Sequence, residues 1–471
     1  MNILPLITNF LNNFNKHFEN KTNLYELENY IVSQGDELTK DLLIKFIEGI
    51  DLEYKYSSLR KQKYYVKETR CRTLLTSVGY IDVNFTFYQN KESKKSFCYI
   101  RDILNLKPYQ RMTDNAEYCL INYAKEDNMA SAGRHAIRNT IISRTTVSRR
   151  IKSLKGSLHE EIKKTDSQPK VLYIEMDEIH ANLQNKFKKD GEKAKNRICP
   201  CAIVHEGHKD ELTKRKELKN VRNFATAKYS YADLWEIVFD YCDKRYDLDK
   251  FDAIFVSGDG ALGIKDYLNV FPKAIFVLDP FHYKKALKYI FKDNNDLIKI
   301  ADDYLRHDMI EEFKIIVESQ TTLYPSSKKY ILEKQTLLLN NIEGIKNQHH
   351  ELYKCPCSME GHVSNKYARF ITSSPYAFSL EGLENKLQLL VMRANKINIS
   401  FEDYLYLKYS ENESEIIINK VKKFKTNFKL TINQFENKTN GLGIKLPILD
   451  SEKENNNIKE LLSPRHQVHY I

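Results

Sequence analysis

Residues 251–285 read FDAIFVSGDGALGIKDYLNVFPKAIFVLDPFHYKK and contain two short apolar runs, at 253–256 and 274–278. Both runs are rich in Ile, Val and Phe, are too short for helices, and are followed by a carboxylate, Asp259 or Asp279. Continuous apolar runs of this length are typical of buried parallel strands. In open α/β sheets the chemistry takes place just beyond the carboxyl ends of such strands. The stretch therefore predicts a sheet with acids at its strand ends, which suits phosphate and metal chemistry.

The α/β pattern begins upstream of this stretch. Residues 170–176 form a further predicted strand, which ends at Asp177. A second strand is expected at 196–205 and a third beginning near 228–231, before an amphipathic helix at 233–246.

The composition predicts a folded protein of several domains. The chain has 471 residues, of which 42% are hydrophobic, with 30 Tyr and 23 Phe. Two to four domains are expected for this length. The net charge of +11 favours a polyanionic partner. The abundance of Lys, Asn, Ile and Tyr also indicates an AT-rich genome, which raises the basic count for reasons unrelated to function.

No feature of the sequence predicts export or membrane insertion. No run approaches the roughly 18 apolar residues of a membrane span, and the opening MNILPLITNFLNNF lacks the pattern of a signal peptide. The eight cysteines do not form a disulfide framework for a chain of this size. A cytoplasmic location, in a reducing compartment, is therefore expected.

The first 113 residues divide into a helical region and a β-hairpin region. Residues 1–57 have apolar side chains at helical spacing, whereas 74–88 alternate apolar and polar residues around a turn at Val78-Gly79. Residues 60–72 carry six basic side chains and one acid. These lysines and arginines fit either a nucleic-acid contact or a solvated sheet edge.

Residues 114–160 predict a helix-turn-helix-like unit. Short helices are expected at 116–124 and 130–137, and Ser143 is a good N-cap for a third helix at 144–155. Val147, Ile151 and Leu154 would face a core, which leaves a basic outer face suited to a DNA major groove. The alternative is a basic surface helix without such a role. The predicted DNA-binding residues are Arg134, Arg138, Arg144, Arg149, Arg150 and Lys152.

The remaining chain is expected to be helical and then α/β again. Residues 286–350 predict consecutive helices, the α/β pattern resumes around 355–375, and 379–394 form a helix. The fold class is therefore an α/β core, a mixed sheet flanked by helices, with an all-helical insertion. The predicted regions are 1–57 (helical), 58–113 (basic hairpin), 114–160 (DNA-binding), 168–285 (first part of the catalytic core), 286–350 (insertion), 351–427 (second part of the core and C-terminal helices) and 428–471 (polar flexible tail).

Three acids form a candidate metal-binding triad: Asp177, Asp259 and Glu360. Cleavage of a phosphodiester requires an activated attacking oxygen and a stabilised leaving oxygen, and two Mg²⁺ ions about 4 Å apart provide both. Mg²⁺, or Mn²⁺ in its place, prefers carboxylate oxygen ligands. The alternative for any one of these acids is a loop or helix-cap residue.

Four motifs, in order, resemble bacterial insertion-sequence transposases of the ISLre type, which belong to the DDE superfamily with an RNase H-like catalytic domain. The motifs are YIEMDEIHANLQ (173–184), GDGA (258–261), LDPFHYK (278–284) and MEGHVS (359–364). The resemblance covers roughly residues 60–400. The related Mutator-like transposases carry Asp-x-x-His after the second catalytic Asp, which Asp279 and His282 match, and an all-helical insertion before the Glu. Here 101 positions separate Asp259 from Glu360.

The resemblance implies that Asp177, Asp259 and Glu360 are the catalytic acids, with supporting roles for Asp279, His282 and His362. His282 would contact DNA phosphate or the active-site carboxylates; the alternative is a histidine satisfied by a backbone carbonyl at a helix start. Neighbouring acids that compete for these roles are Glu175, Glu178, Glu381 and Glu384.

Two Cys-Pro-Cys segments suggest a structural zinc site. Cys199, Cys201, Cys355 and Cys357 would supply four thiolates if the segments meet in space. Cys-x-Cys is a weaker signal than Cys-x-x-Cys, and both segments adjoin apolar residues among which free cysteine packs well. The alternative is therefore four buried thiols without a metal.

The function expected from these observations is that of a DNA transposase. It would bind terminal inverted repeats, cut them with two Mg²⁺ ions, and join the 3′-OH to target DNA, as a homodimer or larger assembly in a bacterial, nucleoid-associated setting. The alternatives are a nuclease without strand transfer, a decayed copy that regulates by binding DNA, and a small-molecule phosphohydrolase. The basic helical region and the long insertion argue against the last.

Overall fold

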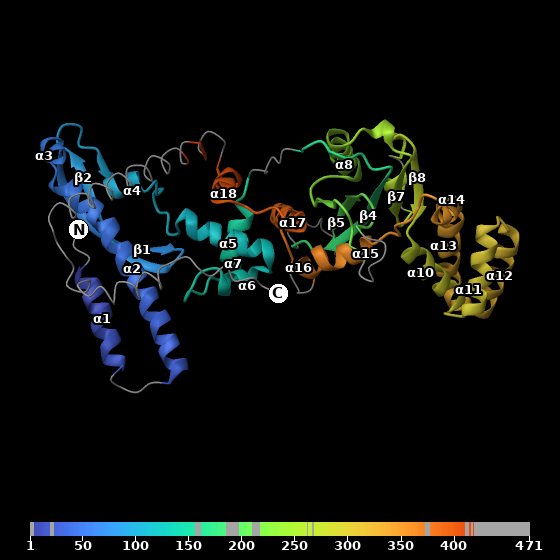
Figure 1. Cartoon of the computed structure of the whole chain (residues 1–471), viewed down its shortest axis with the longest axis horizontal. Coiled ribbons are helices and arrows are strands. Elements are labelled where there is room, and N and C mark those ends of the chain that lie inside the picture. Colours follow the sequence, from blue (N-terminus) through green and yellow to red (C-terminus); the bar gives the residue numbers. More distant parts are fainter. Residues whose placement is uncertain are drawn as a thin grey trace, which may run out of the picture. The chain divides into compact units, whose positions relative to one another are not determined.

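The computed structural model, drawn in Figure 1, describes most of the chain before residue 410. The predicted polar tail at 428–471 lies outside the described residues. The chain divides into two compact units, Met1–Lys408 and Tyr409–Ile471, and all elements below belong to the first. The described residues are 4–18, 23–155, 162–184, 197–209, 217–260, 262–265, 268–372, 377–409, 414, 415 and 418.

The N-terminal region combines helices with a three-stranded antiparallel sheet of order β1-β2-β3. The predicted hairpin is confirmed, and its turn contains Gly79 with φ +107°, a conformation that favours glycine. Val83 and Phe85 of the hairpin pack with Ile47 in one core cluster. The elements are α1 (Leu4–Phe18), α2 (Leu24–Tyr56), α3 (Ser58–Lys63), β1 (Tyr64–Thr76), β2 (Gly79–Asn90), β3 (Ser96–Cys98) and α4 (Tyr99–Ile103).

A unit of three helices follows, comprising α5 (Asp114–Glu126), α6 (Met129–His135) and α7 (Arg144–Lys152). Each helix contacts the other two. The Ser143 side chain caps α7 by accepting a hydrogen bond from Thr146 N, and the predicted inward residues Val147, Ile151 and Leu154 are buried. The predicted helices are thus confirmed, although α7 ends at Lys152 rather than 155.

The central sheet has five strands in the order β6-β5-β4-β7-β8. The strands β4, β7 and β8 are parallel, and β5 is antiparallel to both β4 and β6. The runs at 253–256 and 274–278 are therefore parallel strands, as predicted. The bounds are β4 (Val171–Ala181), β5 (Arg197–His205), β6 (Arg222–Ala225), β7 (Ala253–Gly258) and β8 (Ala274–Leu278).

The prediction of a third strand beginning near 228–231 is wrong. The third strand is β6, and the helix α8 (Tyr231–Arg245) begins at Tyr231. Ser230 and Asp233 form a capping box, each side chain accepting a hydrogen bond from the backbone N–H of the other. This local signal starts a helix and outweighs the β-propensity of the tyrosines.

The two faces of β4 have different neighbours. Leu172 and Ile174 belong to a large apolar cluster with Trp235 of α8, whereas Tyr173 belongs to a smaller cluster on the other face. Successive side chains of a strand point to opposite faces, so Asp177 lies on the face of Tyr173. The acid is therefore directed away from the principal core.

The predicted helical insertion is confirmed and lies at the β8 edge of the sheet, where α14 contacts β8 (Figure 1). Its buried residues Phe313, Val317, Ile331 and Leu338 join the same apolar cluster as the sheet. The elements from β7 onward are α9 (Leu262–Lys265), α10 (Pro280–Phe291), α11 (Asn295–Arg306), α12 (Ile310–Leu323), α13 (Lys328–Leu339), α14 (Ile342–Lys346), α15 (Met359–His362), a π-helix (Val363–Ala368), α16 (Arg369–Ile371), α17 (Leu380–Ala394) and α18 (Phe401–Lys408).

The α/β pattern expected around 355–375 is not found, because the described residues 355–372 include no strand. Val363, Tyr367 and Phe370 are the buried residues that recur at i, i+4 and i+7, which is a helical period. This segment packs as a helix on the sheet, with contacts from the π-helix to β4.

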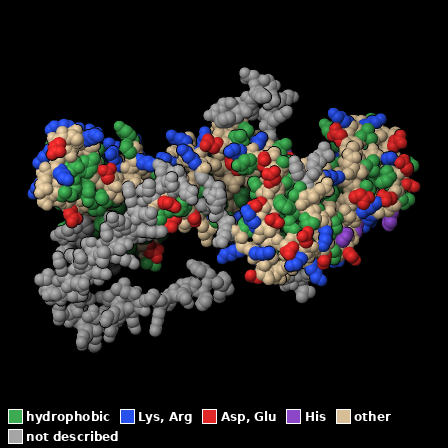
Figure 2. Space-filling model, turned by 90° about the horizontal axis from the view of Figure 1, so that it is seen from above, with side chains coloured by type: hydrophobic (Ala, Val, Ile, Leu, Met, Phe, Trp, Pro, Cys, Tyr) green, Lys and Arg blue, Asp and Glu red, His purple; other side chains and the backbone are tan. Residues whose placement is uncertain are grey.

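The charge of the surface is mixed. On the face drawn in Figure 2, Lys and Arg side chains are interspersed with Asp and Glu. No helix among the described residues combines the length and the apolar character needed to cross a membrane.

Candidate metal centre

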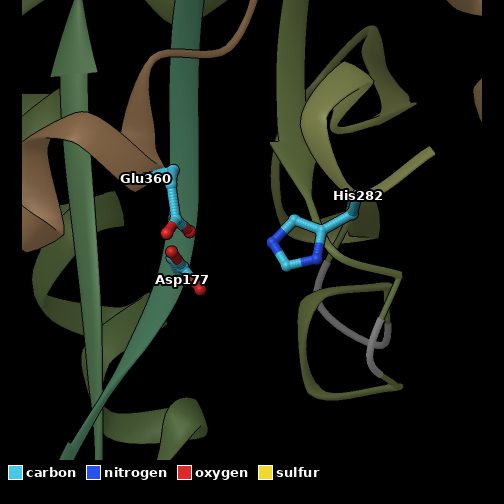
Figure 3. Close-up of side chains that lie close together, drawn as sticks. All are labelled: Asp177, His282 and Glu360. Atoms are coloured by element: carbon cyan, nitrogen blue, oxygen red, sulfur yellow. The ribbon is translucent and has the colours of Figure 1, made fainter. Parts of the chain in front are cut away.

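Three side chains from separate elements converge: Asp177 of β4, His282 of α10 and Glu360 of α15. One potential ligand atom from each residue lies within 4.8 Å of those of the other two. Figure 3 shows the carboxylates of Asp177 and Glu360 close together, with the imidazole of His282 across from them. Carboxylate and imidazole groups at this separation can hold a divalent cation.

Asp177 is half-buried in a negatively charged environment. Burial, together with the charges of Glu360 and Asp259, raises the pKa of its carboxyl group to about 6. The Glu178 backbone N–H, which donates to Asp177 Oδ1 over 2.8 Å, and the nearby His282 act in the opposite direction. A bound cation would compensate the charge that burial and the neighbouring carboxylates oppose.

Asp259 lies at the end of the strand next to Asp177. The last parallel pair between β4 and β7 joins Glu175 to Ser257, and the same register continued by two residues brings Asp259 beside Asp177. The turn after Asp259 requires glycine, since Gly260 has φ +87° and a Cβ there would lie 2.6 Å from Asn341 Nδ2. Asp259 acts on Asp177 through its charge but is not one of the three converging ligands.

Asp279 and His282 occupy the first turn of α10. Asp279 is the N-cap, and its Oδ1 accepts a hydrogen bond from Phe281 N over 2.9 Å. Its Oδ2 lies 4.0 Å from His282 Nε2, and burial raises its pKa. Among the described residues, buried His282 Nε2 has no hydrogen-bond partner. The i, i+3 spacing thus places an imidazole with an unused nitrogen near the carboxylates.

Glu175 connects β4 to the segment that carries Glu360. Its Oε2 accepts hydrogen bonds from Ser358 N at 2.9 Å and Ser358 Oγ at 3.1 Å. Its Oε1 lies 3.1 Å from His205 Nε2, and both side chains are almost fully buried. Glu175 therefore positions the start of α15. The sequence marked it only as a competing acid, and its shared strand face with Asp177, two residues away, was the available signal.

His362 lies on α15 but outside the converging group. Its Nδ1 is buried without a hydrogen-bond partner among the described residues, and burial lowers its pKa to about 4. One turn later, Lys366 Nζ donates to Asn223 Oδ1 over 3.0 Å, and burial lowers the lysine pKa to about 8. Lys366 thus links the segment to β6, and neither His362 nor Lys366 belongs to the converging group.

The other competing acids are engaged elsewhere. Glu178 Oε1 accepts a hydrogen bond from Tyr231 OH at 2.6 Å. Glu384 Oε2 accepts from the backbone N–H groups of Ala227 and Lys228. Glu381 is exposed and lies 3.7 Å from Lys152 Nζ. None of the three belongs to the converging group.

The four cysteines proposed for zinc do not come together. Cys199 and Cys201 lie on β5, where Cys201 Sγ donates to Asp177 O over 3.0 Å. Cys355 Sγ instead lies 3.4 Å from His208 Nε2. Burial raises the pKa of Cys199 to about 12 and that of Cys357 well above its ordinary value. No cysteine is part of a three-ligand group among the described residues.

The predicted DNA-binding side chains lie on α6, α7 and the segment between them. Arg134, Arg138, Arg144 and Arg149 are exposed. The other two are partly buried in ion pairs, Arg150 at 3.4 Å from Glu117 and Lys152 at 3.7 Å from Glu381. A hollow of about 270 Å³ beside α7 is lined by Arg144, Arg149 and Lys152 on one side and by Ser379 and Gly382 on the other.

The donor set fits a divalent cation. The charge of Glu360 raises the pKa of Asp177, and an imidazole nitrogen of His282 has no partner among the described residues, so the site offers charge and a lone pair that a metal would satisfy. Oxygen ligands suit Mg²⁺ and Mn²⁺, and imidazole suits transition metals. Asp177, Glu360 and His282 are therefore the residues that would hold the metal, and Asp259 lies beside Asp177.

Sequence and structure comparisons identify relatives of the chain. The family model described as "Uncharacterised protein family (UPF0236)" matches residues 17–419. A UPF0236 protein of Caldanaerobacter subterraneus subsp. tengcongensis is 30% identical over 400 residues, which cover 84% of this chain and 83% of the relative. A second from the same organism is 30% identical over 379 residues, or 79% and 78% of the two chains.

Among solved structures, the "Drosophila P element transposase strand transfer complex" matches 60% of this chain and 81% of its own. The sequence identity is 12% and the TM-score is 0.23. A TM-score this low does not establish a shared fold.

Proposed function

The chain belongs to the UPF0236 family, an uncharacterised protein family, and we propose that it is a metal-dependent DNA transposase of the DDE superfamily. The observation that carries this proposal is the convergence of Asp177, His282 and Glu360, with Asp259 at the end of the adjacent strand. Clusters of acids with perturbed proton affinity at strand ends are typical of functional sites.

The architecture supports an RNase H-like catalytic domain. In the mixed five-stranded sheet β4 runs on to Ala181, past the end predicted at Asp177, so Asp177 lies within β4 just beyond its last parallel pair with β7, and Asp259 directly follows β7. A helical insertion lies between Asp259 and Glu360, in the position that the motifs imply. The order of the motifs and the order of the elements therefore agree.

The catalytic roles follow from the positions of the side chains. Asp177, His282 and Glu360 would hold a divalent cation, Asp259 would add a further carboxylate from the end of β7, and Asp279 orients His282 by capping α10. Two bound Mg²⁺ ions supply activation of the attacking oxygen and stabilisation of the leaving oxygen of a phosphodiester. Glu175 keeps the start of α15 against β4, so that Glu360 stays within reach of Asp177.

The helices α5 to α7 supply the DNA-binding surface of this proposal. Arg144 and Arg149 of α7 are exposed, and Arg149 lies on the side opposite the buried Val147 and Ile151. A short helix with this division fits a recognition helix in a major groove, where phosphate contacts fix its orientation. Two copies of the chain would bridge the two ends of the element.

The name of one relative supports a mobile element rather than a housekeeping nuclease. That name joins eleven locus designations from one genome. Repetition of a gene at many loci is expected of an element that copies or moves itself.

Cleavage and joining of the gene's own flanking DNA test the proposal. Purified full-length chain is incubated with a labelled duplex that carries these flanks, in Mg²⁺ or Mn²⁺, and cut and joined products are separated on denaturing gels. We expect both products with the wild type, and neither with Asp177→Asn, Asp259→Asn or Glu360→Gln, because each change removes a carboxylate ligand. EDTA should have the same effect.

The matched control is Glu381→Gln, which neutralises an exposed acid outside the converging group. It should cut and join like the wild type, and all variants should retain DNA binding in a mobility-shift assay. Cleavage without joining would favour a nuclease. Binding without cleavage by the wild type would favour a DNA-binding regulator, and full activity of Glu360→Gln would refute the acid assignment.

A further inference from the structure

One face of α10 carries four lysines and two aromatic side chains. They recur at i, i+3, i+4, i+7, i+8 and i+11, a spacing that aligns them along one side of the helix. We call them the α10 stripe. Its members, all exposed, are Phe281, Lys284, Lys285, Lys288, Tyr289 and Lys292.

Packing explains the opposite face of α10 but not the stripe. Tyr283, Leu287 and Ile290 face the apolar cluster of the sheet and are buried. Phe281 and Tyr289, in contrast, are 45% and 38% exposed. Both rings lie beside the lysines, so the stripe offers aromatic surface together with positive charge.

The lysines of the stripe repel one another. Lys284 and Lys288, and then Lys288 and Lys292, are separated by four residues, at which like charges destabilise a helix. Among the described residues, a single ion pair offsets this repulsion on the stripe. It joins Lys288 Nζ to Asp293 Oδ1 at 3.6 Å. A polyanion lying along α10 would relieve the repulsion.

The aromatic rings and the ammonium groups are interleaved. Lys285 Nζ lies 5.5 Å from the centre of the Phe281 ring, and Lys292 Nζ lies 4.5 Å from that of Tyr289. Lys292 also lies 5.6 Å from the ring of Tyr324, which follows α12. The stripe lines a shallow hollow of about 730 Å³. Alternating ring faces and positive charges are what a nucleic-acid strand with unpaired bases requires.

The stripe begins at the metal centre. Phe281 directly precedes His282, and the two rings meet edge to face at 5.4 Å between centres. From Phe281 to Lys292 the helix rises about 17 Å away from this point. A DNA strand that reaches the carboxylates would therefore meet the stripe as it leaves them.

We propose that the α10 stripe binds a single-stranded segment of the DNA that occupies the metal centre. The lysines contact its phosphates, and Phe281 and Tyr289 stack on its unpaired bases. Duplex DNA could use the lysines but offers no free base faces to the rings, which is why the exposed aromatics favour a single strand. The inference rests on the proposed function, which supplies the DNA, but its test does not depend on catalysis.

Fluorescence anisotropy of full-length chain with a labelled oligo-deoxythymidine strand, in EDTA and over a range of KCl concentrations, tests the stripe. We expect Phe281→Leu/Tyr289→Leu to weaken binding by about tenfold or more, because each lost stack is worth on the order of 1 kcal/mol or above. The slope of log affinity against log salt should not change, since no charge is removed. The charge variant Lys284→Gln/Lys285→Gln/Lys288→Gln should reduce the magnitude of the slope by about 2.

Matched controls separate these effects from general ones. Tyr80→Leu/Tyr330→Leu removes two aromatics that are similarly exposed on other elements. Lys244→Gln/Lys299→Gln/Lys314→Gln removes the same charge from other exposed helix positions. Both controls should bind the strand within about twofold of the wild type.

Unchanged single-strand binding by the aromatic variant would overturn the inference. If the charge variant weakened duplex and single-strand binding equally and the aromatic variant had no effect, the stripe would be a duplex contact. That outcome would also overturn the inference. Asp177→Asn should bind the strand like the wild type. Loss of cleavage alone therefore counts against the proposed function, and loss of stripe-dependent binding alone counts against this inference.

Discussion

At the scale of single residues, the buried carboxylate of Asp177 favours a bound cation. Without a cation, the same buried charge lowers the free energy of unfolding. The pKa of this carboxyl group rises from 3.8 to about 6 on folding. Between these pH values the folded chain holds more protons than the unfolded chain, so stability decreases as the pH rises through this range. Above about pH 6 the full cost is present.

We therefore predict that Asp177→Asn stabilises the metal-free protein. At neutral pH in EDTA the free energy of unfolding should rise by about 1–2 kcal/mol, which allows for the partial exposure of the group. The gain should shrink as the pH falls and disappear near about pH 3, where Asp177 is protonated in both the folded and the unfolded chain. Thermal unfolding over a pH series measures both.

The control for this prediction is Asp240→Asn, which removes an exposed acid that pairs with Lys244 on α8. Its effect should stay within about 0.5 kcal/mol at every pH. If Asp177→Asn instead lowered the melting temperature in EDTA at neutral pH, the charge of Asp177 would be compensated by groups of the chain itself.

At the scale of elements, the three-helix unit depends on a close approach that only glycine permits. Gly133 O of α6 accepts a hydrogen bond from Ile142 N over 2.7 Å, and a Cβ on Gly133 would clash with Ile142 O. The contact sets the position of the segment that leads into α7, and thus of its basic face.

We predict that Gly133→Ala destabilises this unit by about 1–3 kcal/mol, because the methyl group overpacks a backbone contact. DNA binding should weaken in the same variant, measured by mobility shift at a temperature at which the rest of the chain stays folded. In the interior of α2, a Cβ added at Gly35 would meet no atom within 4 Å among the described residues, so Gly35→Ala should be neutral or stabilising. Equal behaviour of the two variants would contradict the role of the Gly133 contact.

At the scale of the whole first unit, α17 joins the three helices to the sheet. Glu384 accepts backbone hydrogen bonds at the end of β6. The next residue, Asn385, donates through Nδ2 to the carbonyl oxygens of Ile151 and Leu154 at the end of α7. One turn of α17 thus fixes the proposed DNA-binding helix relative to the sheet that carries the acids.

We predict that Asn385→Ala loosens α7 selectively, because its terminal carbonyl groups lose a half-buried hydrogen-bond donor worth about 1–2 kcal/mol. Hydrogen–deuterium exchange should accelerate in α7 and remain unchanged in β4. Glu381→Ala, an exposed change on the same helix, should leave both rates unaffected. Faster exchange in β4 as well would mean that α17 supports the fold as a whole rather than this junction.

The predictions that succeeded rest on local patterns. The runs at 253–256 and 274–278 are strands, and Ser143 caps α7, because apolar periodicity and capping depend on nearby residues alone. The prediction of a strand at 228–231 was wrong, although the capping box at Ser230 that starts the helix is also a local signal. The helical residues within 355–372 were not predicted, because each of their helical pieces is short.

The sequence by itself determined in which elements most of the candidate residues lie, because apolar runs and helix starts are encoded within a few residues. Only the tertiary structure decided that His282 joins Asp177 and Glu360, that Glu175 holds the start of α15, and that the four cysteines stay apart. These outcomes depend on strand register and on contacts between segments more than a hundred residues apart, such as Glu175 with Ser358. No local pattern specifies such contacts, since they follow from how complete elements pack.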